Sequence, residues 1–168
     1  WHVLTELGGD RKSLIINLGG GVVTDLGGFV ASTFKRGVDF INIPTTLLSM
    51  VDASVGGKTG VDLGNLKNQI GVINVPQMVL IDTQYLETLP QTEMRSGLAE
   101  MLKHGLIYDA AYWREFLDIT SIDYNGLDEL IYRSVEIKNE IVIQDPTEKN
   151  IRKALNFGHT LGHAIERY

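Results

Sequence analysis

Short apolar runs alternate with turns and helical spacing along the first half of the chain. The run at residues 13–18 (SLIINL) leads into three glycines, after which residues 22–34 have helical spacing. Two further runs, at residues 40–43 before Pro44 and at residues 78–82, have the length and composition of buried strands. Strands that alternate with helices are typical of an α/β unit with a parallel sheet, and we predict such a unit here.

Residues 45–74 separate the second of these strands from the third and are predicted to form one long loop. The segment contains five glycines among polar residues. Loops of this length in compact domains are usually functional or disordered. Apolar residues such as Leu47, Val51 and Ile70 argue against disorder. We therefore expect an ordered, functional loop.

From about residue 86 onward the pattern is helical only. Helices are expected at residues 91–106, 110–117, 127–143 and from 150 onward. Pro90 marks a boundary ahead of the first of them. The predicted fold class is thus α/β plus all-α, in which residues 1–88 form part of a Rossmann-like parallel-sheet domain and residues 89–168 part of an all-helical domain.

The composition is that of a soluble globular protein, with 168 residues, 43% hydrophobic and 21% charged. A formal net charge of −6 provides no basic surface for nucleic acid or for an anionic membrane. The chain has no cysteine for disulfides, and no apolar stretch typical of a signal peptide or a membrane span. We therefore expect a cytoplasmic protein. Because the chain starts at Trp1 and stops at Tyr168 inside a helical pattern, we expect a fragment of a longer one.

The turn GGGVVTD, at residues 19–25, is the first candidate binding site. It follows a predicted strand and opens a predicted helix, where free N–H groups and the helix dipole can hold a pyrophosphate. Glycine turns between a strand and a helix are also common for steric reasons. This feature alone leaves phosphate binding and close packing as even alternatives.

Charged and polar side chains stand among the glycines of the predicted 45–74 loop, namely Asp52, Lys58, Lys67 and Asn68. Lysines can neutralise phosphate or carboxylate, and a nearby aspartate can orient hydroxyls or relay protons. The alternative is a solvated loop that carries ordinary surface charges.

In the helical half, His159 and His163 are four residues apart and project from one face of a helix, as metal ligands on a helix often do. No glutamate occupies the position that it has in an HExxH motif, so a metalloprotease is excluded and a further ligand must come from elsewhere. Glu100, with Lys103 one turn later, is the best candidate. The alternatives are a packing or capping role for the histidines and a surface position for Glu100.

Further polar side chains precede the histidines, namely Lys138, Glu148, Arg152 and Asn156. They could line a pocket for an anionic substrate. They could equally form an exposed helix face with ion pairs such as Glu148 with Arg152.

Five stretches, taken in order, resemble the 3-dehydroquinate synthase family over essentially the whole chain. They are GGGVVTDLGGFVAST, FKRGVDFINIPTTLLSMVDASVGGKTGVD, LKNQIG, GLAEMLKHG and RKALNFGHTLGHAIE. The resemblance implies an N-terminal nucleotide-binding α/β domain and an all-helical domain, with the active site in the cleft between them. It also implies the family's reaction on a sugar acid phosphate in the shikimate pathway. In that cycle bound NAD oxidises a ring hydroxyl, phosphate leaves by β-elimination, the ketone is reduced again and the ring closes by an aldol step.

The resemblance also assigns roles to individual residues. The implied NAD contacts are Gly20, Gly21, Val22, Val23, Thr24, Asp25, Thr45, Thr46, Lys58 and Lys67. The implied substrate contacts are Asp52, Lys58, Asn68, Lys103, Lys138, Glu148, Arg152 and Asn156. Arg36 resembles a phosphate-binding arginine that completes the site of a dimer partner, so a homodimer is implied.

Glu100 and His159 match two of the family's three metal ligands, for zinc or cobalt, and the third is a histidine expected beyond Tyr168. His163 resembles a proton-transfer group on the substrate side. The departures from the family pattern are Leu66, where glycine is common, and Thr24 and Gly27 in place of other small residues, and they leave the functional positions intact. Because parts of the NAD and metal sites would lie outside the chain, we expect the isolated 168 residues to be inactive.

Other functions fit the sequence less well. A related sugar phosphate cyclase would act on another sugar phosphate, but Lys138, Arg152 and Asn156 argue against it, since those cyclases tend to change the positions that meet the substrate carboxylate. A metal-dependent polyol dehydrogenase shares the fold and the glycine turn but fits the SVGGKTG and LKNQIG segments poorly. A binding module without activity is opposed by the intact candidate residues of the helical half.

Overall fold

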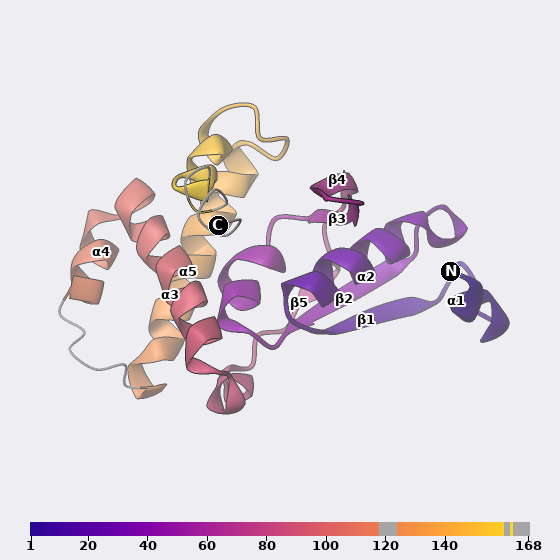
Figure 1. Ribbon diagram of the computed structural model, residues 1–168, viewed down its shortest axis with the longest axis horizontal. Coiled ribbons are helices and arrows are strands. Elements are labelled where there is room, and N and C mark those ends of the chain that lie inside the picture. The colour runs from indigo at the N-terminus through magenta and orange to yellow at the C-terminus, as the bar shows by residue number, and fades with distance from the viewer. Residues whose placement is uncertain (118–123, 160–161, 163–168) are drawn as a thin grey trace. The chain divides into compact units, whose positions relative to one another are not determined.

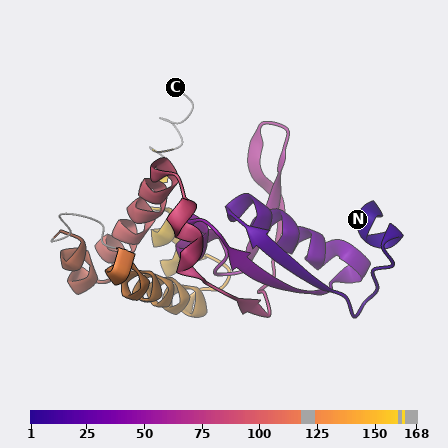
Figure 2. The same ribbon diagram turned by 90° about the horizontal axis from the view of Figure 1, so that it is seen from below.

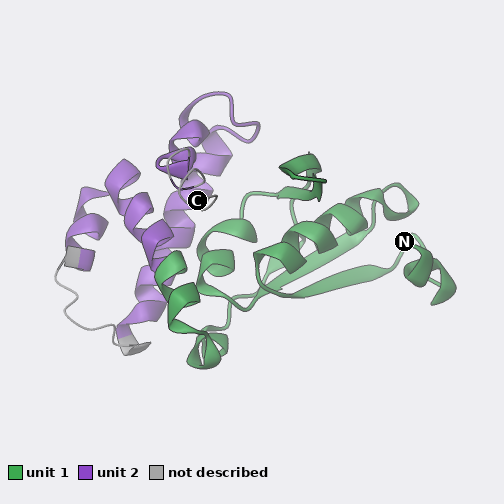
Figure 3. Cartoon of the chain, viewed as in Figure 1, with its two compact units in different colours: residues 1–97 green, residues 98–168 purple. Residues whose placement is uncertain are grey.

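The computed structural model describes residues 1–117, 124–159 and 162, and Figure 1 and Figure 2 show its helices and strands in two views. The chain divides into two compact units, residues 1–97 and 98–168 (Figure 3). The division lies inside helix α3 (Gln91–Tyr108), whereas the domain boundary predicted after residue 88 precedes this helix. Helix α3 therefore contributes residues to both units.

A three-stranded parallel sheet organises the first unit. Its strands β1 (Leu14–Gly19), β2 (Asp39–Pro44) and β5 (Met78–Val79) lie in the order β1-β2-β5. Helix α2 (Gly21–Thr33) connects β1 to β2 and runs along the sheet (Figure 1), and a short helix α1 (His2–Glu6) precedes β1. The parallel α/β unit predicted from the sequence is confirmed.

The third strand is shorter than predicted. Only Met78 and Val79 pair with β2, although the Leu80 N–H also donates to the Asn42 carbonyl at 2.9 Å. The chain then turns into the 3₁₀ helix η3 (Thr83–Thr88), because the Asp82 carboxylate caps it by accepting the Gln84 N–H at 3.0 Å. An aspartate at the end of the apolar run thus stops the strand.

A small apolar core packs α2 and the 3₁₀ turn η1 (Phe34–Arg36) against the strands. Its buried members are Ala31, Phe34, Val38 and Phe40, with Leu4 and Ile15 packed against them. Gly27 allows α2 to approach β1 closely, since a Cβ at this position would overlap the Asn17 side-chain amide.

The loop predicted for residues 45–74 is wrong in its main part. The segment forms a short π-helix, η2 (Ser49–Ala53), and an antiparallel hairpin of β3 (Lys58–Leu63) and β4 (Leu66–Ile73) that extends from the first unit (Figure 2). Every residue of β4 is exposed, so this strand carries no alternation of buried and exposed positions that a sequence pattern could show. Cross-strand pairs such as Val61 with Ile70 stabilise the hairpin instead.

The second unit is helical, as predicted, and contains the end of α3, α4 (Ala110–Leu117) and α5 (Tyr124–Gln144). Asp109 links α4 to α5 through hydrogen bonds. Its Oδ1 accepts the N–H groups of Ala111 at 3.0 Å and Tyr112 at 3.1 Å at the start of α4, and its Oδ2 accepts a 2.7 Å hydrogen bond from Arg133 on α5. None of the helices in the described parts of the chain is long and apolar enough to cross a membrane.

The helix predicted from residue 150 onward is wrong in its first part. The chain forms a 3₁₀ helix, η4 (Ile151–Asn156), and then leaves helical geometry at Gly158, whose φ is 82°. A glycine in the left-handed region commonly ends a helix. The Gly162 N–H donates to the Gly158 carbonyl at 2.9 Å.

Candidate functional site

The glycine turn at residues 19–21 lies where β1 and β2 end together. Gly19 is opposite Pro44 in the parallel register, and the Thr45 N–H donates to the Gly19 carbonyl at 3.0 Å. The turn is crowded, since a Cβ at Gly20 would lie 3.1 Å from Thr46 Cγ2. The structure therefore brings together two predicted cofactor segments at the carboxyl edge of a parallel sheet, which is where such folds bind nucleotides.

Hydroxyl groups fix the backbone around this turn. The Thr24 hydroxyl donates to the Gly21 carbonyl at 2.9 Å inside α2, and its side chain is buried. The Thr46 hydroxyl lies 2.9 Å from the Ser49 hydroxyl and accepts the Ser49 N–H at 3.2 Å. Both predicted threonines thus hold the local fold, whereas Val22 at the start of α2 is exposed.

A pair of buried asparagines, which the sequence analysis did not single out, links the sheet to η2. The Asn17 amide donates to the Asn42 side-chain carbonyl at 2.9 Å across β1 and β2, and the Asn42 amide reaches the Ser54 carbonyl at 3.4 Å. Ser54 directly follows η2, the helix that carries Asp52. An asparagine inside an otherwise apolar strand was the available signal, because a buried amide needs hydrogen-bond partners.

The hairpin separates candidates that the sequence placed in one loop. Lys58 begins β3 opposite Ile73, whereas Lys67 and Asn68 lie toward the other end of β4. Five residues of strand between Asn68 and Ile73 correspond to roughly 16 Å. Asn68 has a φ of 52°, and its N–H donates to Asp62 Oδ1 at 2.7 Å. Within the first unit, Lys58 is therefore not placed beside Lys67 and Asn68.

Arg36 lies in an exposed turn with unusual backbone geometry. Lys35 and Arg36 have φ values of 51° and 74°, and Gly37 follows with 115°. Two successive non-glycine residues in the left-handed region are uncommon, and such strain persists only where the surroundings impose it. Here the buried Phe34 ring and the hydrogen bond from Gly37 N–H to Phe34 O, 2.8 Å long, anchor the turn. The turn presents Arg36 at the end of α2.

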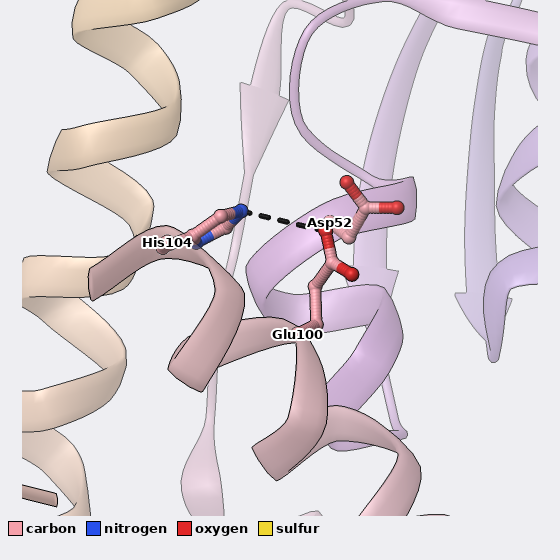
Figure 4. Close-up of side chains that lie close together, drawn as sticks. All are labelled: Asp52, Glu100 and His104. Carbon is pink, nitrogen blue, oxygen red and sulfur yellow. Dashed lines mark ion pairs between the residues drawn. The ribbon is translucent and has the colours of Figure 1, made fainter. Parts of the chain in front are cut away.

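In the second unit, Glu100, Lys103 and His104 occupy one face of α3 and are all buried. The Lys103 ammonium contacts Glu100 Oε1 and donates to the Leu155 carbonyl. His104 Nε2 lies 3.5 Å from the same carboxylate oxygen (Figure 4). The sequence analysis missed His104, although its spacing four residues after Glu100 was a usable signal.

The loop between α5 and η4 is built around a second residue that the sequence analysis missed. The buried Asp145 carboxylate accepts the N–H groups of Lys149 at 2.9 Å, Asn150 at 2.6 Å and Arg152 at 3.2 Å. Burial alone would raise the pKa of Asp145, but these N–H donors outweigh it and hold the pKa below its usual value. The loop is thereby held in one conformation.

This loop and η4 carry three predicted substrate contacts. Arg152 is buried and donates from Nη1 to the Pro146 carbonyl at 2.8 Å. Glu148 has a φ of 57°, and its carboxylate accepts a 2.7 Å hydrogen bond from the Asn156 amide. The structure thus places Glu148 and Asn156 together, eight residues apart in sequence.

The second unit buries an unusual amount of charge. Glu100, Lys103, Lys138 and Arg152 are each at most 8% exposed, and all four were predicted as site residues. Charged side chains are seldom this buried unless they are paired or serve a function. The alternatives of a surface position for Glu100 and of an exposed helix face for Lys138 and Arg152 are therefore wrong.

The second predicted metal ligand, His159, is half-buried in the turn after Gly158. His163 lies outside the described residues, so the prediction that both histidines share a helix face stays a prediction. The Glu100 carboxylate on α3 and the His159 imidazole are the predicted donors, and carboxylate with imidazole is a ligand chemistry that suits zinc and cobalt. The second unit therefore fits a metal of this type.

Solved structures of related enzymes have a similar fold. One is 2-epi-5-epi-valiolone synthase from Streptomyces hygroscopicus, with NAD⁺ and Zn²⁺ bound. It is 30% identical to this chain with a TM-score of 0.89, and the match covers 98% of this chain and 48% of the synthase. 2-Deoxy-scyllo-inosose synthase in complex with carbaglucose-6-phosphate, NAD⁺ and Co²⁺ is 28% identical over 99% of this chain and 46% of its own length, with a TM-score of 0.87. The chain thus has the Rossmann-like fold of the sugar phosphate cyclases.

The sequence comparisons identify the family within this class. The model of the 3-dehydroquinate synthase N-terminal domain matches residues 1–96, and that of the C-terminal domain matches residues 97–168. A 3-dehydroquinate synthase from Parabacteroides distasonis is 51% identical over 99% of this chain and 48% of its own length. The chain belongs to the 3-dehydroquinate synthase family, and it spans about half the length of the curated relatives that it matches.

Proposed function

We propose that the protein is a 3-dehydroquinate synthase, which converts 3-deoxy-D-arabino-heptulosonate 7-phosphate to 3-dehydroquinate and phosphate in the shikimate pathway. The observation that carries the proposal is the buried set of Glu100, Lys103, Lys138 and Arg152 in a member of this family. A substrate with one carboxylate and one phosphate needs fixed cations, and three of these four residues are cations. The identity of 51% to a 3-dehydroquinate synthase supports it further.

NAD and a divalent metal, zinc or cobalt, are the proposed cofactors, because related cyclases hold them. NAD would bind at the glycine turn and its neighbours, Gly20, Gly21, Val22, Val23, Thr24, Asp25, Thr45, Thr46, Lys58 and Lys67. Glu100 and His159 would hold the metal. When bound, NAD accepts a hydride from the substrate and the metal polarises the oxygen that is oxidised.

The side chains of this chain then bind and orient the substrate. Its contacts would be Asp52, Lys58, Asn68, Lys103, Lys138, Glu148, Arg152 and Asn156, with His163 as a proton-transfer group. Lys103 is anchored by Glu100 and the Leu155 carbonyl, so its ammonium needs no reordering when an anion binds. Glu148 and Asn156 hold each other in the same way.

We further propose a cytoplasmic homodimer in which Arg36 completes the partner's phosphate site. The strained turn that presents Arg36 supports this role, because backbone strain is often kept at binding sites. The 168 residues alone would be inactive, since they span about half the length of the curated relatives that they match.

A phosphate-release assay tests the function. The purified full-length protein should release phosphate from 3-deoxy-D-arabino-heptulosonate 7-phosphate only with NAD and a divalent metal. Glu100→Ala, which removes a proposed ligand, should lower the rate about 100-fold or more. Glu93→Ala, an exposed glutamate on the same helix, should retain the rate.

The competing function is that of a sister cyclase, which the structural similarity to 2-epi-5-epi-valiolone synthase favours. Phosphate release from a neutral sugar phosphate, with none from the sugar acid phosphate, would establish this alternative. It would also remove Lys138, Arg152 and Asn156 from the carboxylate site.

A further inference from the structure

We propose that His104 is a positioning residue that orients the Glu100 carboxylate toward a bound metal, with Ser134 holding the imidazole. The inference rests on the proposed function, in which Glu100 is a metal ligand. It assigns a task to a buried histidine that neither the proposed ligands nor the proposed substrate contacts include. All three residues belong to the second unit.

The imidazole of His104 is held between two helices. His104 on α3 and Ser134 on α5 are both fully buried, and His104 Nδ1 lies 2.7 Å from the Ser134 hydroxyl oxygen. One ring nitrogen is thereby fixed, and the other is directed at the carboxylate, with Nε2 3.5 Å from Glu100 Oε1 (Figure 4). Among the described residues, Nε2 has no hydrogen-bond partner within normal geometry.

The surroundings select one tautomer. If Nε2 carried a lone pair, it would face the negative carboxylate oxygen and repel it, whereas an N–H at this position is attracted. The tautomer with its N–H on Nε2 has its lone pair on Nδ1, which accepts a hydrogen bond from the Ser134 hydroxyl. Ser134 thus donates to His104, and His104 points its N–H at Glu100. A small rotation of the carboxylate would shorten the distance from Nε2 to Oε1 to that of a hydrogen bond.

This arrangement acts on one oxygen of the carboxylate. Within the second unit, the described contacts of Glu100, from Lys103 and from His104, both involve Oε1. Donors on Oε1 turn Oε2 toward a metal and keep the carboxylate from rotating. Partners of metal ligands commonly act in this way, and their loss typically lowers metal affinity about 10- to 100-fold.

Two matched amide variants test the role of Nε2. The side-chain nitrogen of glutamine in His104→Gln can occupy the place of Nε2, whereas that of asparagine in His104→Asn can occupy only the place of Nδ1. Zinc affinity of the purified protein is measured by competition with a chelating dye, without substrate. His104→Asn should bind zinc about 10- to 100-fold more weakly, and His104→Gln within about threefold of the unmodified protein.

Wild-type zinc affinity in His104→Asn, or an equal loss in both variants, would overturn the proposal. Ser134→Ala gives a second test if either amide variant fails to fold, and it should weaken zinc binding severalfold; unchanged zinc affinity in it also overturns the proposal. Asp109→Asn is the structural control, because it loses the 2.7 Å ion pair between Asp109 and Arg133 and should lower the melting temperature without changing zinc affinity. A full-length protein that binds zinc but releases no phosphate would refute the proposed function and leave this inference intact.

Discussion

The carboxylate of Asp109 combines two stabilising roles at a single residue. One oxygen caps α4 and the other pairs with Arg133 on α5. The hydrogen bond from Arg133, together with the N–H donors of α4, holds the pKa of Asp109 below its ordinary value of 3.8. Its contribution to stability is therefore complete above that value and is lost as the pH falls through the lower pKa of the folded protein.

Two variants of Asp109 should separate these roles. Asparagine keeps the cap but loses the ion pair, so Asp109→Asn should destabilise the protein by about 0.5 kcal/mol. Asp109→Ala loses both and should cost about 1–2 kcal/mol. Urea unfolding at pH 7 measures both costs.

The pH dependence provides the check on Asp109. The difference in unfolding free energy between the wild-type protein and Asp109→Asn should narrow as the pH falls below 3.8. Below this value the Asp109 carboxyl of the unfolded chain is protonated, and that of the folded protein follows as the pH reaches its lower pKa. A constant difference down to pH 3 would contradict the ion-pair role.

At the same scale, the sequence identified the proposed ligand contacts better than the buried residues that hydrogen-bond around them. Glu100, Lys103, Lys138 and Arg152 were predicted from charge and spacing, and all are buried. His104 and Asp145 were missed. Their partners, the Ser134 hydroxyl and the N–H groups of residues 149–152, come together only when the chain folds.

At the scale of helices, two glycines differ in the space around them. Gly97 lies within α3, where a Cβ would overlap the Leu47 side chain and approach the Leu48 nitrogen to 2.7 Å. In α5, a Cβ at Gly126 would meet nothing within 4 Å. Both glycines lie inside helices, but only Gly97 is closely packed, so the two positions can be compared directly.

Alanine at the two positions should have opposite effects. Gly97→Ala should destabilise the protein by about 1–3 kcal/mol, because overpacking outweighs the better helix propensity. Gly126→Ala should stabilise it by up to about 1 kcal/mol. Thermal unfolding measures both changes, and a stabilised Gly97→Ala variant would show that α3 does not pack tightly against Leu47.

Elements with clear periodicity were predicted well from the sequence. Strands β1 and β2 and helices α2, α3, α4 and α5 all lie where apolar spacing indicated them. The hairpin of β3 and β4 was missed because its residues are mostly exposed. The helix predicted from residue 150 was wrong in its first part, where η4 is followed by Gly158 with a left-handed φ of 82°. The spacing of apolar residues does not reveal an exposed strand or a left-handed backbone conformation.

For the whole molecule, metal binding should raise stability. A ligand that binds only the folded protein stabilises it by about 2.7 kcal/mol at 100 times its dissociation constant. Zinc should therefore raise the melting temperature of the metal-free protein, and a chelator should reverse the shift. Glu100→Gln, which keeps the size of the side chain but not its charge, should show little shift; the same shift as in the wild-type protein would exclude Glu100 as a ligand.

The sequence alone determined the family, the α/β-then-helical order and most candidate residues, because these depend on residue type and local spacing. The tertiary structure decided which of them meet. It brought the glycine turn to Thr45, separated Lys58 from Asn68 along a hairpin, and placed His104 between Ser134 and Glu100. Such contacts join residues far apart in the chain, and their energies depend on burial and on partners that no local pattern specifies.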